Sequence, residues 1–378
     1  MPAESASPDM NTTTILIFPL DIDDADVFIL TAKALGLAVV GASSAMAGPG
    51  DKAVDDFIRL PFITDPTFDQ ALQNALEQHA VTTIHAPHQG VWRHLNTLLK
   101  THPGRFRFTL CRPDPFSATQ QRFAPHEAWA ASMSSDSSLA GLAAPQAIRP
   151  SLSPARYSAL HRQFLSIPGD SDVGKLRALC DIARLLPPGD LLEVGCLYGR
   201  SAFALGYLAR QYTLGSMICV DPWNTAELTD QGAAAAIINV ELANTDIDSE
   251  KIFRVFLNAA ALLDNVGYIR ATSEKATGQY EAAIRSGALH SPELGSIPVS
   301  GKLSLLHVDA NHRYDHVRRD VELWSPYLAE GGWLLLDDYV WAFGDGPRRV
   351  GDELLGSPLY DSAFVSGDTL FLRRTGVN

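Results

Sequence analysis

The chain has 378 residues, enough for two domains, and it is 46% hydrophobic and 19% charged, as in ordinary globular proteins. The net charge of −13 argues against a broad surface for nucleic acid or for an anionic membrane. No apolar run reaches the roughly 18 residues of a membrane span, and the first residues lack the basic and apolar regions of a signal peptide. We therefore expect a cytoplasmic protein with neither nucleic-acid nor membrane partners.

The first third of the chain reads as a short tail followed by a small domain. Residues 1–12 are predicted to be disordered, and residues 13–114 are predicted to form a small α/β domain, because apolar runs alternate with helix-like stretches. The runs predicted as strands are Ile15–Phe18, Ala38–Ala42, Val81–Pro87 and Phe106–Pro113. No glycine-rich nucleotide motif accompanies them, so three roles stay open for this domain: docking the molecule on which the second half of the chain acts, dimerisation, or none.

Residues 115–150 are rich in Ala, Ser, Pro and Gln without a lasting period, which predicts a linker. From 151 to 378 apolar runs and helix-like stretches alternate again, and a strand pair with a Gly-Asp turn closes the chain. The five runs predicted as strands before this pair are Leu191–Gly195, Ser216–Asp221, Gly267–Arg270, Leu303–Asp309 and Gly331–Tyr339. The pattern predicts a doubly wound, seven-stranded, Rossmann-like α/β sheet that ends in an antiparallel hairpin.

The stretch "EVGCLYGRSA" reads as a strand-to-helix turn. Gly195 lets the backbone turn sharply, and Gly199 lets a ligand approach the start of the helix. Asp221 ends the next strand, where an acid can accept hydrogen bonds from both ribose hydroxyls of an adenosine. The G-x-x-x-G spacing and the preceding Glu193 disfavour a nicotinamide dinucleotide, because the carboxylate repels a pyrophosphate and suits a cationic amino-acid end.

Acidic side chains also end the two strands that follow later in the chain. Asp309 closes one apolar run, and Asp337 with Asp338 closes the next. Carboxylate oxygens suit a hard cation such as Mg²⁺, which lowers the pKa of a bound hydroxyl and orients its oxygen. His312 lies three residues beyond Asp309 and is the candidate general base.

Taken together, "EVGCLYGRSA", "VDANHRYDHVRRDVELW" and "GGWLLLDDY" resemble the class I S-adenosylmethionine-dependent methyltransferases, from about Leu176 to the C-terminus. Within that class they look like the branch of metal-dependent macrolide-sugar and aminocoumarin-sugar O-methyltransferases. The family often has glycine where this chain has Ala310, and a side chain there narrows the metal site.

The resemblance implies roles for individual residues. On the methionine side of the cofactor it places Glu193, Gly195, Tyr198, Gly199 and Ser201. It implies that Asp221 holds the ribose, that Trp223 lies close to the adenosine, and that Ser273 and Glu274 lie on the adenine side. It further implies metal binding by Asp309, Asp337 and Asp338, with His312 as the base.

Alternatives remain at this stage. Asp309 and Asp338 could serve the cofactor and a loop without any metal, and Tyr198 and Trp223 could simply pack in the core. His307 is interpreted as a satisfied core histidine. The expected function is O-methylation of a sugar or glycosylated small molecule with S-adenosylmethionine and Mg²⁺ as cofactors; the alternatives are a metal-independent small-molecule methyltransferase and a catalytically silent cofactor-binding protein. The acceptor and a homo-oligomeric state stay open.

Overall fold

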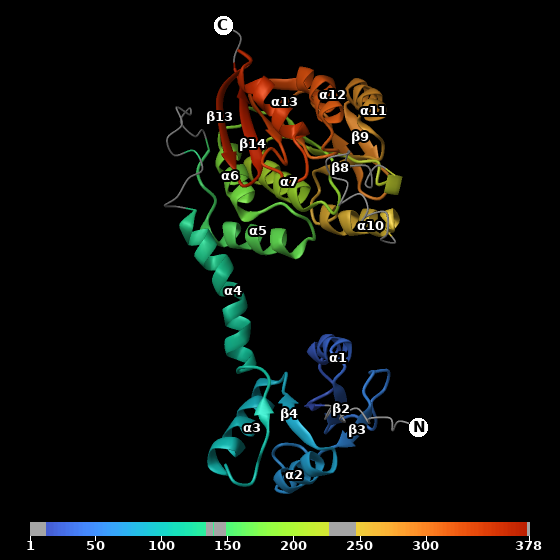
Figure 1. Cartoon of the computed structure of the whole chain (residues 1–378), viewed down its shortest axis with the longest axis vertical. Helices are drawn as coiled ribbons and strands as arrows, with labels where there is room; N and C mark the ends of the chain where they lie inside the picture. Colours follow the sequence, from blue (N-terminus) through green and yellow to red (C-terminus); the bar gives the residue numbers. More distant parts are fainter. Residues whose placement is uncertain (1–12, 134–138, 140–148, 227–246, 376–378) are drawn as a thin grey trace, which may run out of the picture. The chain divides into compact units, whose positions relative to one another are not determined.

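The computed structural model describes residues 13–133, 139, 149–226 and 247–375 (Figure 1). The chain divides into two compact units, residues 1–125 and residues 126–378. The predicted disordered tail lies outside the described residues, as does part of the predicted linker. None of the helices that the structure describes is both long and apolar enough to cross a membrane.

The N-terminal unit contains a five-stranded sheet of order β3-β2-β1-β4-β5, in which all neighbouring strands are parallel. Its strands are β1 (Thr14–Ile17), β2 (Ala38–Ser43), β3 (Asp56–Arg59), β4 (Val81–His85) and β5 (Thr109–Leu110). Its helices are α1 (Asp24–Ala34), α2 (Phe68–Gln78) and α3 (Gln89–Thr101). The predicted small α/β domain is confirmed. Strand β3 was not predicted, because both of its ends are charged and exposed, which hides the apolar signal of a strand.

The segment predicted as a linker starts with a helix, α4 (Pro115–Ser132), and the division between the two units falls inside it. Ala130 is the one buried residue along this fully described helix. Because a helix shows itself in a sequence through its buried apolar stripe, α4 left no periodic pattern to detect.

The C-terminal unit contains a seven-stranded sheet of order β13-β14-β12-β11-β6-β7-β8 (Figure 1). Its strands are β6 (Asp190–Val194), β7 (Met217–Val220), β8 (Val266–Ile269), β11 (Leu303–Val308), β12 (Leu328–Leu336), β13 (Tyr360–Ser366) and β14 (Thr369–Arg374). Strand β14 runs antiparallel to both neighbours, and the other paired strands run parallel. The predicted Rossmann-like sheet with its terminal hairpin is confirmed.

Helices cover both faces of this sheet. They are α5 (Pro154–Ser166), α6 (Val173–Ala183), α7 (Arg200–Tyr212), α10 (Ser249–Ala260), α11 (Ser273–Ser286), α12 (Tyr314–Trp324) and α13 (Gly346–Leu355). Leu191, Leu305 and Leu335 point into one apolar cluster with α5, α6, α7 and α10. The next residue of each strand points into a second cluster, with α11, α12 and α13. This alternation makes the unit doubly wound, as continuous apolar runs require.

A small two-stranded sheet, β9 (Ala288–Ser291) with β10 (Gly295–Pro298), was not predicted from the sequence. More important for function, the strand order reverses between β6 and β11, which lie side by side. The register pairs Val194 with Val308 and Val308 with Leu336, so β6, β11 and β12 end at the same level. The residues that follow them therefore meet at one edge of the sheet, where doubly wound folds bind ligands.

Candidate active site

A cavity of about 960 Å³ lies at this edge. The residues after β6, β7, β11 and β12 line it, together with the first residues of α11 and part of α12. Such a volume is of the size that holds a cofactor or a drug-sized ligand. Every described residue that lines the cavity belongs to the C-terminal unit.

The glycine turn after β6 is held close to its neighbours. Gly195 has a φ of 85°, and a Cβ atom there would lie 2.1 Å from the backbone oxygen of Asp309. Gly199 has a φ of 86°, and a Cβ atom there would lie 2.9 Å from Cδ2 of Phe256. The sequence predicted that Gly199 gives a ligand room. In the structure, the ring of Phe256 on α10 fills the space that a Cβ atom of Gly199 would take, and the cofactor contact of Gly199 stays a prediction.

Asp221 is buried beside the same turn and lines the cavity. Its Oδ2 accepts hydrogen bonds from the backbone N–H groups of Cys196 at 2.8 Å and Leu197 at 3.0 Å, and Oδ1 accepts from that of Trp223 at 2.6 Å. Burial raises the pKa of this carboxyl group, and the three N–H groups oppose the rise. A carboxylate has about four acceptor positions, so Asp221 holds the turn in shape and keeps about one position for a ribose hydroxyl, where the sequence predicted contacts with two.

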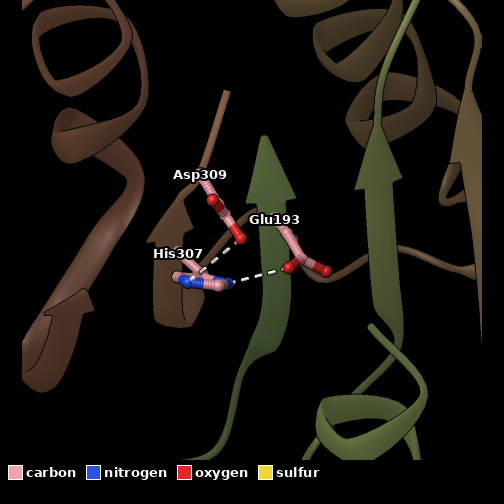
Figure 2. Close-up of side chains that lie close together, drawn as sticks. All are labelled: Glu193, His307 and Asp309. Atoms are coloured by element: carbon pink, nitrogen blue, oxygen red, sulfur yellow. Dashed lines mark hydrogen bonds and ion pairs between the residues drawn. The ribbon is translucent and has the colours of Figure 1, made fainter. Parts of the chain in front are cut away.

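Of the residues predicted on the methionine side, Gly195, Tyr198 and Ser201 line the cavity. Glu193 instead is fully buried behind it. Its Oε1 accepts a hydrogen bond from Ser201 Oγ and lies 2.8 Å from Nδ1 of His307 (Figure 2). Glu193 therefore orients Ser201 and His307, and its carboxylate is not placed on the cavity wall.

Trp223 also lies away from the cavity wall. Its ring packs 4.9 Å from that of Phe253 and 4.5 Å from that of Phe256, and its Nε1 donates to the backbone oxygen of Leu197 at 2.8 Å. The ring of Trp223 therefore packs as the alternative expected, and its predicted place close to the adenosine stays a prediction. Through its hydrogen bond to Leu197, Trp223 supports the glycine turn.

Ser273 and Glu274, the first residues of α11, line the cavity, as the adenine-side prediction requires. Ser273 Oγ accepts a hydrogen bond from Nε1 of Trp324 at 2.7 Å. Asp320 of α12 lines the same region and was missed, because an aspartate on an amphipathic helix reads as a solvated residue. Burial raises the pKa of Asp320 to about 6.

His312 and Asp338 meet at the end of the cavity that the residues after β11 and β12 line. Nε2 of the histidine lies 2.7 Å from Oδ2 of the aspartate. Together with Asp309, they offer one ligand atom each, all within 4.8 Å of one another. The indole ring of Trp341 packs 4.1 Å from the imidazole of His312. The structure thus brings together the predicted base and two of the three predicted metal ligands.

The third predicted ligand, Asp337, is differently engaged. It is buried and accepts hydrogen bonds from Nζ of Lys175 and from Oγ1 of Thr369. Burial alone raises its pKa, but the Lys175 ammonium and His307 outweigh burial and hold the pKa below its usual range. The pKa of Asp309, by contrast, is raised well above its usual value by burial and by the negative charge of Asp337. Lys175 was missed, because a lysine in a helical segment ordinarily reaches solvent.

His307, interpreted from the sequence as a satisfied core histidine, is fully buried but only half satisfied. Its Nε2 finds no hydrogen-bond partner among the residues that the structure describes. That nitrogen lies 4.0 Å from Oδ2 of Asp309 and 3.9 Å from Oδ2 of Asp337. A dashed line in Figure 2 marks the first of these pairs. Glu193, His307 and Asp309 form a second group whose ligand atoms lie within 4.8 Å of one another.

Comparison with known proteins agrees with this site. Residues 192–339 match the model of a family described as a methyltransferase domain. No curated protein matches the chain in sequence. The C-terminal unit therefore contains a methyltransferase domain, and its chemistry is methyl transfer from S-adenosylmethionine.

Several solved structures are similar to this chain. The O-methyltransferase NovP is 18% identical over 52% of this chain and 79% of its own, with a TM-score of 0.36. The calicheamicin methyltransferase CalS11 is 15% identical over 69% of this chain and 93% of its own, with a TM-score of 0.35. MycE, from the mycinamycin biosynthetic pathway and in complex with Mg and S-adenosylhomocysteine, is 13% identical over 50% of this chain and 45% of its own, with a TM-score of 0.31. At these TM-scores they assign neither an acceptor nor a metal to this chain.

Proposed function

We propose that the protein methylates a hydroxyl group of a sugar or of a glycosylated small molecule, with His312 as the base and a divalent cation beside it. The observation that carries this proposal is the 2.7 Å pair of His312 and Asp338 in the cavity that the glycine turn also lines. Methyl donor and base then share one space, as an in-line transfer from a sulfonium requires.

The cofactor fits the part of the cavity on the β6 and β7 side. Its methionine end lies against Gly195, Tyr198 and Ser201, its ribose against Asp221, and its adenine against Ser273 and Glu274, all of which line the cavity. The acidic group follows β11 and β12, on the opposite side of the reversal point. A cofactor held by these residues would present its methyl group on the side of Asp309 and His312, which line the same cavity.

The proton of the acceptor goes to His312. Its Nε2–H donates to Asp338, so the nitrogen that would take the proton is Nδ1, which has no hydrogen-bond partner among the described residues. The Asp338 carboxylate would stabilise the imidazolium formed in this way. The acceptor oxygen forms the new bond to the methyl carbon as the carbon–sulfur bond breaks. The products are the methyl ether and S-adenosylhomocysteine.

The residues present fit a divalent cation at Asp309 and Asp338. Both carboxylates line the cavity, and the pKa of Asp309 is raised first by burial and then by the negative charge of Asp337, which a bound cation would offset. Oxygen ligands of this kind suit Mg²⁺, and a bound cation lowers the pKa of a coordinated hydroxyl. Asp337, turned towards Lys175, is not needed as a ligand.

Aromatic residues at the His312 end of the cavity support a sugar or an aromatic aglycone as acceptor. Trp341 and Phe343 both line the cavity, and their rings lie 5.5 Å apart. Large apolar ring faces of this kind bind the flat, apolar faces of such ligands.

A metal-independent methyltransferase is the second candidate. It is favoured by Lys175, because this residue already supplies one positive charge to the acidic group. In that case, His312 and Asp338 would perform the proton transfer by themselves, as a base and the carboxylate that orients it.

The test is an acceptor screen with the full-length chain. The enzyme is incubated with S-adenosylmethionine and glycosylated small molecules, with Mg²⁺ or with excess chelator, and S-adenosylhomocysteine is quantified. We expect turnover that chelator abolishes and that Asp338→Asn reduces, whereas Asp361→Asn, on β13, leaves it unchanged. Turnover that survives the chelator but is still reduced by Asp338→Asn selects the metal-independent alternative.

A further inference from the structure

The acidic group contains a buried cation of its own, Lys175 on α6. Its side chain is 1% exposed. Its Nζ donates to Asp337, donates to Oγ of Ser171 at 3.2 Å, and lies 3.9 Å from Oδ1 of Asp368. Since a buried ammonium is costly unless it is paired, these oxygens hold the lysine head group in one place.

The carboxylates around Lys175 carry more negative charge than its single ammonium group neutralises. Burial and the Asp337 charge raise the pKa of Asp309 and of Asp368, while Lys175 lowers both pKa values. The unpartnered Nε2 of His307 lies within 4.0 Å of carboxylate oxygens of both Asp309 and Asp337. The ammonium of Lys175 is thus what allows several carboxylates to sit together beside the cavity.

The hydrogen-bonding arrangement of His307 is like that of metal-binding histidines. Its Nδ1 lies 2.8 Å from Oε1 of Glu193, and its unpartnered Nε2 is the ring nitrogen on the side of the Asp309 and Asp337 carboxylates. Metal-binding histidines commonly donate their other ring N–H to a carboxylate in this way. In this chain, however, the positive charge next to Asp337 comes from a lysine.

We propose that Lys175 is the resident cation of this group, occupying with its ammonium the charge position that a divalent cation would otherwise take beside Asp337, Asp309 and His307. Its positive charge repels a divalent metal ion that would bind at this same position. Removal of the charge therefore opens a divalent-cation position. The ion at Asp309 and Asp338 belongs to the proposed function, and only this part of the inference rests on it. Lys175 is a positioning residue, since it does not line the cavity.

The experiment is a Mn²⁺ titration of the full-length, chelator-treated chain, with free Mn²⁺ followed by electron paramagnetic resonance. The variants are Lys175→Met and Lys175→Gln, the second of which keeps a hydrogen-bond donor. Lys302→Met is the matched control, because this exposed lysine precedes β11 at the end away from the site. The double variant Lys175→Met/Asp337→Asn removes both members of the ion pair.

We expect each Lys175 variant to bind one more Mn²⁺ per chain than the wild type, or to bind it at least about tenfold more tightly, which corresponds to about 1.4 kcal/mol. The double variant and Lys302→Met should behave as the wild type. A wild type without Mn²⁺ and a Lys175 variant with one ion would uphold this inference while removing the metal from the proposed function. Equal Mn²⁺ binding by folded wild type and folded Lys175 variants, including none in either, overturns it.

Folding provides a second readout. If the Lys175 variants are unfolded in metal-free buffer, we expect Mn²⁺ to restore a cooperative thermal transition, because the ion replaces the missing ammonium. Variants that stay unfolded at saturating Mn²⁺ contradict the proposed role.

Discussion

His312 and Asp338 come from the ends of two neighbouring parallel strands, and their Nε2 and Oδ2 atoms lie 2.7 Å apart. We expect His312→Gln to lower kcat by a factor of about 100 to 10,000, the usual contribution of a general base. Binding of S-adenosylhomocysteine should persist, since His312 lies at the acidic end of the cavity.

Steady-state kinetics on an acceptor found in the screen, with calorimetry for the cofactor, measure both effects. His290→Gln on β9 is the matched control, because His290 contacts Ser296 of β10 and does not line the cavity. A kcat within twofold of the wild type for His312→Gln would remove this residue from the mechanism.

Gly195 and Gly278 give a second, paired prediction. A Cβ atom at Gly195 would meet the backbone of Asp309 at 2.1 Å, whereas one at Gly278, inside α11, has nothing within 4 Å. We expect Gly195→Ala to destabilise the C-terminal unit by about 3 kcal/mol or more, because positive φ and backbone overlap act together. Gly278→Ala should stabilise it by up to about 1 kcal/mol, through helix propensity. Urea unfolding measures both, and equal effects of the two substitutions would contradict the turn geometry.

Asp320 makes the stability of the C-terminal unit depend on pH. Burial raises its pKa to about 6 from the usual 3.8, so the folded chain binds the proton more tightly than the unfolded chain. Stability from this group is present below about pH 4 and is lost as the pH rises to 6, by about 3 kcal/mol for a shift of about two pKa units. We expect Asp320→Asn to be more stable than the wild type at pH 8 and equal to it at pH 4. A destabilised Asp320→Asn at pH 8 would contradict this.

His85 gives the N-terminal unit the opposite dependence. It is fully buried, and its ring stacks on Phe28 at 3.8 Å. Burial and the charge of Arg112 lower its pKa to about 4 from 6.5, so the unfolded chain binds the proton more tightly. Stability is therefore complete above about pH 6.5 and falls by up to about 3 kcal/mol as the pH drops to 4.

We expect His85→Phe to reduce this acid sensitivity, because the ring stack stays and the titrating nitrogen is gone. Hydrogen exchange of peptides from β4 at pH 7 and pH 4.5 measures it within the N-terminal unit. His102→Phe, at an exposed position, is the control. An unchanged pH response of His85→Phe would show that another group carries it.

The sheet was predictable because its strands are apolar runs closed by acids. Val308 and Leu336 are buried, and Asp309 and Asp337 follow them directly, so the strand ends and their shared edge could be derived from sequence. Side-chain direction could not be derived. Asp337 turns towards Lys175, a partner 162 residues away, and no local pattern records such a contact.

Gly199, in the glycine turn, and Trp223, which follows β7, show the same limit. Both lie in the motif region, and sequence position alone suggested a ligand. In the structure both pack against Phe256 of α10, which follows only after a long stretch of chain. Tertiary packing, which a single sequence does not display, therefore decides whether such a residue faces the cofactor or the core.

The most direct test of the central claim is calorimetric titration of the full-length chain with S-adenosylhomocysteine, repeated with Tyr198→Ala. We predict saturable binding of one nucleoside per chain that Tyr198→Ala weakens, because Tyr198 lines the cavity next to the glycine turn. Phe116→Ala, on exposed α4, should bind as the wild type does. No detectable nucleoside binding by a folded wild-type chain would contradict the account of this cavity as a methyltransferase active site.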